Sequence, residues 1–64
     1  MSTPTAYDLY RAAYYNGAAV EALAKAKSFR DLWRRTGEPV DRSIMRQFAR
    51  EWRVYVARAR SFQS

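Results

Sequence analysis

Strong helix breakers are rare in this chain. Only two glycines and two prolines occur among its 64 residues. The segment Thr36-Gly37-Glu38-Pro39 holds one of each and is expected to end a helix, because glycine adopts a left-handed cap cheaply and proline commonly follows such a cap. We find no strand-like alternation, internal repeat or low-complexity tract. The sequence therefore predicts a single all-α domain, residues 1–64, built as a helical hairpin.

The first half of the chain favours helix on both sides of Asn16-Gly17, and residues Thr5 to Asp8 have the form of a capping box. On a helical wheel, one set of side chains points together: Leu9, Tyr10, Ala13 and Tyr14. A second set points roughly 140° away: Ala18, Ala22, Ala26, Phe29 and Trp33. One straight helix cannot bury both sets against one neighbour. We therefore expect a kink or turn at Gly17, a short additional N-terminal helix, and two to three helices in all.

The alanines of the helix expected from about Ala18 to Arg35 allow another helix to approach closely. That neighbour is either the last helix or a second copy of the chain, which makes a homodimer one expected state. The last helix is expected from Asp41, a good N-cap, to about Ser61. Its apolar side chains recur with the clearest helical period in the chain: Ile44, Phe48, Trp52, Tyr55, Ala59 and Phe62.

Positive charge is concentrated in the last third of the chain. The net charge is +6, and residues 42–64 contain six arginines and one acid, Glu51. Five of these arginines fall within about 80° on a helical wheel, and we call them the arginine stripe: Arg42, Arg46, Arg50, Arg53 and Arg60. Of the five, only Arg42 has an acid three or four residues away. The ion pairs between arginines and acids that usually occur on a solvated helix face are therefore missing from the rest of the stripe.

Four interpretations of the arginine stripe remain open at this point. It is a solvated helix face, a surface for nucleic-acid phosphates, a docking site for an acidic protein, or the polar side of a membrane-surface helix. Arginine pairs with phosphate and carboxylate through two parallel hydrogen bonds. The apolar side of the helix is needed for the core of so short a chain, which argues against the membrane.

Enzyme chemistry has little support, because the chain has no histidine and no cysteine and its six acids are scattered. We expect no catalytic residue, no metal site, no cofactor and no small-molecule substrate. The N-terminus lacks a secretory signal and no apolar run approaches the roughly 20 residues of a membrane span, so a soluble cytoplasmic protein is the default expectation. The tyrosines of the first helix either stack on bases or pack, and Trp33 and Trp52 are expected as core or interface anchors.

Two segments resemble ribosome modulation factor, a family of small basic helical proteins that bind ribosomes. "AYYNGAAVEALAKAK" is similar to the early helix of that family, and "EPVDRSIMRQFAREWR" resembles its proline turn and following helix. The resemblance implies ribosomal RNA as the partner and favours RNA over DNA.

We thus expect a regulator that binds structured RNA or the ribosome through the arginine stripe, with four further basic residues adding to the surface: Lys25, Lys27, Arg34 and Arg35. The alternative is an inhibitor or adaptor of the type that phages and mobile elements encode, docking on an acidic protein through Tyr10, Tyr14 and Trp33.

Overall fold

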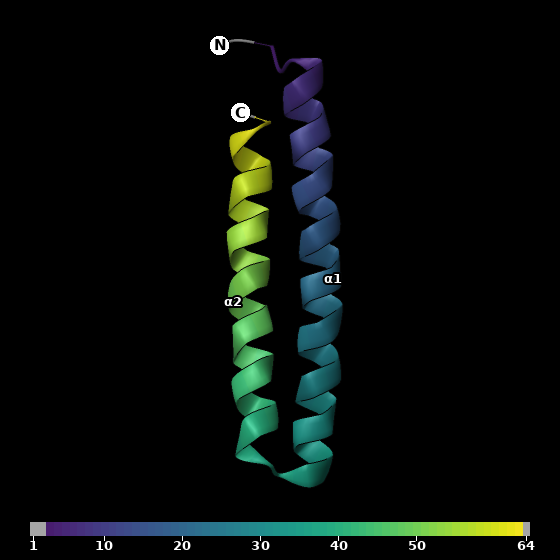
Figure 1. Ribbon diagram of the computed structural model, residues 1–64, viewed down its shortest axis with the longest axis vertical. Helices are drawn as coiled ribbons and strands as arrows, with labels where there is room; N and C mark the ends of the chain where they lie inside the picture. The colour runs from purple at the N-terminus through teal and green to yellow at the C-terminus, as the bar shows by residue number, and fades with distance from the viewer. Residues whose placement is uncertain (1–2, 64) are drawn as a thin grey trace.

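Two antiparallel helices joined by a short turn make up the computed structural model, which describes residues 3–63. Helix α1 spans Ala6–Thr36 and helix α2 spans Pro39–Ser61. Figure 1 shows them side by side along the length of α2, with the start of α1 extending beyond the end of α2 and both termini at the end opposite the turn. The predicted all-α hairpin is confirmed. The molecule measures 49 × 14 × 11 Å, and neither helix has an apolar stretch of membrane-spanning length within the described residues.

Helix α1 begins at the predicted capping box. The backbone N–H of Asp8 donates to Thr5 Oγ1 at 3.1 Å, and the backbone N–H of Thr5 donates to Asp8 Oδ2 at 3.0 Å. These bonds satisfy backbone donors that a helix N-terminus otherwise leaves unpaired. Arg34 and Arg35 lie in the last turn, where positive charge is favourable beside the negative end of the helix dipole.

The predicted break at Gly17 is wrong, because α1 runs through this residue without interruption. Glycine inside a helix costs only about 0.5–1 kcal/mol relative to alanine, and a helix packed along a partner tolerates that cost. The break is also unnecessary. Leu9, Tyr10 and Tyr14 are not buried; their exposed fractions are 55%, 67% and 57%.

The turn between the helices is fixed by backbone geometry and by two side chains. Gly37 adopts a left-handed φ of 69°, and its N–H donates to the carbonyl of Trp33 at 2.7 Å. Helix α2 then starts at Pro39 with Glu38 as its N-cap, so the prediction that Asp41 is the N-cap is wrong. Proline suits the first helical position because its φ is already helical. Asp41 is instead buried and accepts a hydrogen bond from Thr36 Oγ1 at 2.8 Å.

The core is a seam of alanines on α1 facing larger side chains on α2. Five residues of α1 are buried: Ala12, Tyr15, Ala19, Ala22 and Ala26. Aromatic pairs bridge the helices, with centroid separations of 5.9 Å for Phe29–Phe48 and 6.2 Å for Tyr15–Tyr55. The buried alanines therefore contact α2, which is the first of the two neighbours that the sequence allowed. No large side chain in the described residues is fully buried, so the core is thin.

Candidate nucleic-acid interface

Helix α2 carries the whole arginine stripe on its solvent side. The apolar positions of this helix face α1, and the stripe residues lie away from them and are all exposed. Within residues 3–63, the only ion pair is Arg30–Asp31, at 3.6 Å between Nε and Oδ1. The stripe arginines therefore have no carboxylate partner in the described chain, and their guanidinium groups remain available to an anion from outside.

Arg46, Arg50 and Arg53 form the centre of the stripe. Together with Ala49 they line one shallow depression on the surface of α2. Arg46 and Arg50 line a second depression with Ser43 and Gln47, which adds a hydroxyl and an amide beside the guanidinium groups. Spacings of three and four residues place these arginines one turn apart on a single face, so they can contact successive anionic groups along a backbone.

Arg42 has a different environment from the rest of the stripe. Its guanidinium carbon lies 5.5 Å from the centroid of the Trp33 ring, within the range of a cation–π contact. Trp33 is half-buried at the turn end of α1. The structure thus places this tryptophan partly in the core and partly beneath an arginine, rather than as a fully exposed anchor for a protein partner.

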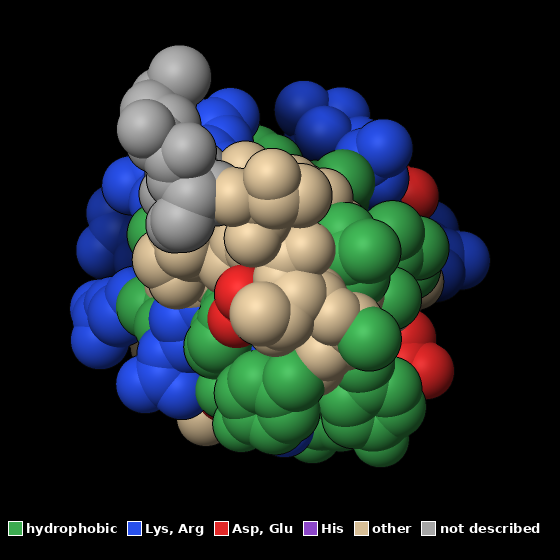
Figure 2. Space-filling model, turned by 90° about the horizontal axis from the view of Figure 1, so that it is seen from above, with side chains coloured by type: hydrophobic (Ala, Val, Ile, Leu, Met, Phe, Trp, Pro, Cys, Tyr) green, Lys and Arg blue, Asp and Glu red, His purple; other side chains and the backbone are tan. Residues whose placement is uncertain are grey.

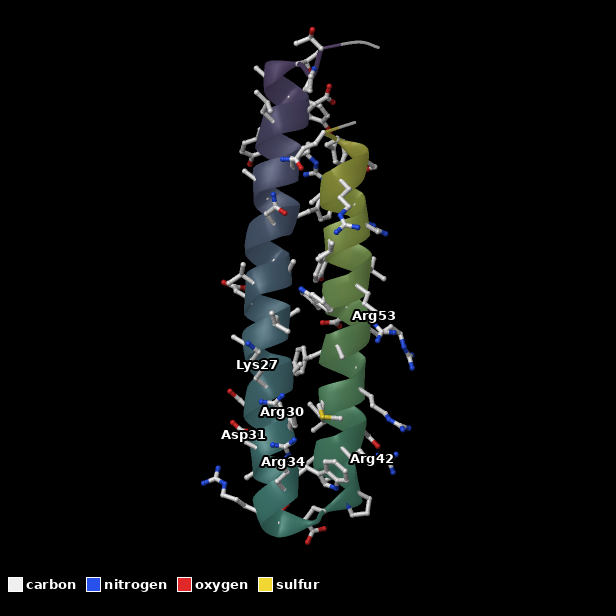
Figure 3. All side chains as sticks on the ribbon, turned by 180° about the vertical axis from the view of Figure 1, so that it is seen from behind. Lys27, Arg30, Asp31, Arg34, Arg42 and Arg53 are labelled. Carbon is white, nitrogen blue, oxygen red and sulfur yellow. The ribbon has the colours of Figure 1, made fainter. Side chains whose placement is uncertain are left out.

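Two cationic side chains of α1 join the stripe across the seam. Lys27 and Arg30 line one groove with Arg46, and the floor of that groove is apolar: Leu23, Ala26, Met45 and Ala49. In Figure 3 the labelled Lys27, Arg30 and Arg34 follow α1 along the side of the hairpin on which Arg42 and Arg53 follow α2. The basic surface therefore covers both helices and is wider than the arginine stripe.

Arg30 was missed by the sequence reasoning, although a signal for it exists. Lys27, Arg30 and Arg34 are spaced by three and four residues, which places them on one face of a helix. That face could be assigned to the same side as the stripe only once the packing of α1 against α2 was known.

Lys25 lies apart from this surface, so the expectation that it adds to the stripe is wrong. It lines a separate pocket with Glu21 and Glu51, and its Nζ lies 5.5 Å from the centroid of the Phe48 ring. Two carboxylates at this pocket make it unfavourable for phosphate. Arg35 is exposed, but no described contact brings it to the stripe. Of the four added basic residues, Lys27 shares a groove with Arg46 of the stripe, and Arg34 follows the same side of α1 in Figure 3.

A second group of cations surrounds Tyr15 at the open end of the hairpin. Arg11 Nη2 donates to the Tyr15 hydroxyl at 2.9 Å, and the guanidinium carbon of Arg58 lies 5.7 Å from the ring centroid. Arg58 beside the hydroxyl is the largest cause of a lowered Tyr15 pKa; burial opposes it, and the charge of Arg11 adds to the lowering. Arg11 Nε is buried without a hydrogen-bond partner in the described chain.

Tyr10 and Tyr14 lie on α1, apart from the arginine stripe. Both are exposed, and the Tyr14 ring meets Tyr15 edge-on at a centroid distance of 5.3 Å. Figure 2, which looks along the molecule from its open end, shows a continuous hydrophobic area at lower right, while Lys and Arg side chains project mainly at left and top. The hairpin therefore presents two chemically different sides.

A scan against protein-family models finds no match to this chain, and searches of the curated proteins and of the solved structures find none either.

Proposed function

We propose that this protein is a small non-enzymatic regulator that binds nucleic acid, structured RNA or the ribosome in particular, through the arginine stripe. The observation that carries the proposal is the row of exposed arginines on one straight helix, with no carboxylate partner among residues 3–63. From Arg42 to Arg60 the stripe extends over about 27 Å at the rise of an α-helix. Several phosphates of a folded RNA lie within that length, and arginine binds each of them with directed hydrogen bonds.

The surroundings of the stripe agree with phosphate binding. Lys27 and Arg34 widen the surface onto α1. Ser43 and Gln47 add a hydroxyl and an amide, groups of the kind that contact sugars and phosphates in protein–nucleic acid complexes. The preference for RNA over DNA rests on the resemblance of two segments to ribosome modulation factor. The mechanism is electrostatic occupation of an RNA surface, in which counterions leave the RNA as the arginines arrive.

The test compares two double variants that remove the same charge from different faces. We expect Arg46→Gln with Arg50→Gln to weaken binding to an RNA hairpin at least tenfold, because both side chains belong to the centre of the stripe. Lys25→Gln with Arg35→Gln is the matched control and is expected to change the affinity less than twofold. Fluorescence anisotropy measures both, and circular dichroism confirms that helicity is kept. Equal weakening by the two variants contradicts the proposal.

A second candidate function has one structural observation in its favour. The groove between Lys27, Arg30 and Arg46 has an apolar floor, which is the shape that a short acidic and amphipathic segment of another protein fills. Tyr10 and Tyr14 offer further exposed anchors. Capture from lysate with and without nuclease separates the two functions. Recovery that nuclease abolishes supports nucleic acid, and one protein retained after nuclease and moderate salt supports the adaptor.

A further inference from the structure

The outward side of α1 is apolar along its first two thirds, and the hairpin leaves it uncovered. We define the outer α1 face by six residues that fall within about 80° on a helical wheel: Ala6, Tyr10, Ala13, Gly17, Val20 and Ala24. All six are exposed, and the exposed fractions of Tyr10 and Val20 reach 67% and 68%. Leu9 and Tyr14 extend this face on its two edges. Contiguous exposed apolar surface of this kind usually marks an interaction site.

The chain exposes more surface than a compact monomer of its mass, which leaves area for a partner to cover. A monomeric globular protein of 7.5 kDa exposes roughly 4,200 Å², whereas this chain exposes 5034 Å². The excess of about 800 Å² equals the share that each partner contributes to a protein–protein interface of standard size. The radius of gyration is 14.9 Å, against roughly 11 Å for a compact domain of this length, so the chain is also more extended than such a domain.

The distribution of charge favours the outer α1 face as the place where a second copy docks. Residues 3–24 contain only Asp8, Arg11 and Glu21 as charged residues, whereas residues 25–63 contain eleven cations and four acids. A second copy of the chain is repelled by the basic part and meets a nearly neutral apolar surface only on the first two thirds of α1. That surface is self-complementary, as a two-fold symmetric interface requires.

We propose that a second copy of this chain docks antiparallel on the outer α1 face, so that the two α1 helices pack against each other. The two-fold axis lies between Ala13 and Gly17, where small side chains let the two helices approach closely. Tyr10 then packs against the partner's Val20, and Ala6 lies opposite the partner's Ala24. The antiparallel arrangement sends the two basic turn ends in opposite directions, while a parallel one sets them side by side. The inference does not depend on nucleic-acid binding.

Sedimentation equilibrium of the full chain tests the dimer. We expect the parent to dimerise, and Ala13→Glu to raise the dimer dissociation constant at least tenfold by placing a charge at the axis. The matched control is Val54→Glu, which adds the same charge at an exposed apolar position of α2 and is expected to leave the constant unchanged within twofold. A parent that stays monomeric at every accessible concentration overturns the proposal, as does equal weakening by both variants.

Disulfide mapping tests the orientation, and the chain offers a clean background because it has no cysteine. Chains carrying Ala6→Cys and tagged chains carrying Ala24→Cys are mixed in a glutathione redox buffer. We expect the mixed disulfide to exceed either self-linked product at least fivefold, because the antiparallel pairing places each cysteine opposite the other. Predominant self-linking of the Ala24→Cys chain, or products in random proportion, overturns the antiparallel arrangement.

Discussion

Tyr15 lies where the thin core meets the cationic residues. Only 9% of this residue is exposed, and its ring stacks on Tyr55 and Phe62 with centroid distances of 6.2 and 5.9 Å. The guanidinium groups of Arg11 and Arg58 flank the same ring at 5.0 and 5.7 Å. No carboxylate balances these two cations within the described ion pairs. A single tyrosine therefore contributes apolar packing through its ring and accepts a hydrogen bond from Arg11 at its hydroxyl.

The flanking arginines make the titration of Tyr15 a testable property. Its pKa is lowered from 10.0 by Arg58 and by Arg11, with burial acting in the opposite direction. As pH rises through the folded pKa, the folded state loses this proton while the unfolded state keeps it until about 10. Unfolded chains then bind more protons, so stability rises with pH in that interval.

We expect absorbance of ionised tyrosine to rise in the parent at a lower pH than in Tyr15→Phe. The free energy of unfolding of the parent, relative to this variant, is expected to increase as pH approaches 10. Urea unfolding over this pH range gives the comparison, and Tyr10→Phe is the control because its hydroxyl has no described partner. Identical titration curves for the parent and both variants contradict the prediction.

At the level of elements, the sequence predicted helix ends better than helix faces. Capping by Thr5 and Asp8 and the cap at Gly37 follow local rules, and both are present. The inward face of α1 was misassigned before Gly17, where Ala12 and Tyr15 are buried and the larger side chains of Leu9, Tyr10 and Tyr14 are exposed. The alanines in the core of α1 are buried because aromatic rings of α2 pack against this face. That complementarity is a property of two helices together, which periodicity within one segment does not reveal.

The two glycines allow the same substitution to be tested in opposite backbone conformations. Gly17 is helical and Gly37 is left-handed, and an added methyl group meets nothing within 4 Å at either site. We expect Gly17→Ala to stabilise the fold by about 0.5–1 kcal/mol, because glycine loses more backbone entropy in a helix. Gly37→Ala is expected to destabilise it by about 1 kcal/mol, since a side chain strains the left-handed conformation.

Urea unfolding of both variants at one low protein concentration measures these two differences. Because Gly17 belongs to the outer α1 face, the comparison is repeated with Ala13→Glu present in every chain. Effects of the same sign in that background show that the backbone account of these positions is wrong.

For the candidate interface, sequence alone grouped the five stripe arginines, because one helical wheel contains them all. Sequence alone could not show which cations of α1 lie on the same side of the hairpin as the stripe. Lys25 and Lys27 are two residues apart, yet one lines a pocket with Glu21 and Glu51 and the other a groove with Arg46. Deciding between those sides requires knowing which face of α1 is buried against α2. The grouping of the α1 cations was therefore predicted only in part, whereas the grouping of the α2 arginines followed from the amphipathic period alone.

Charge is distributed unevenly along the chain, and the neutral and basic parts favour different kinds of partner. The first two thirds of α1 are nearly neutral and suit an apolar partner, whereas α2 and the rest of α1 are basic. Association through the outer α1 face leaves the arginine stripe uncovered, because the stripe lies on α2. The proposed dimer and the proposed RNA binding are thus compatible, and we expect variants on one surface to leave the other intact.

The salt dependence of RNA binding reports how many cations of the whole surface contact phosphate. Each neutralised phosphate contributes about −0.7 to −0.9 to the slope of log affinity against log salt, so five stripe arginines predict a slope of about −4. Arg53→Gln is expected to reduce its magnitude by about 1, because this residue is exposed at the centre of the stripe and forms no ion pair within the described part of the chain. Lys25→Gln is expected to leave the slope unchanged, since Lys25 lies beside two carboxylates. Anisotropy titrations between about 50 and 200 mM salt resolve these differences. A parent slope near −1 shows that the stripe does not lie along phosphates, and equal reductions in both variants show that net charge alone attracts the RNA.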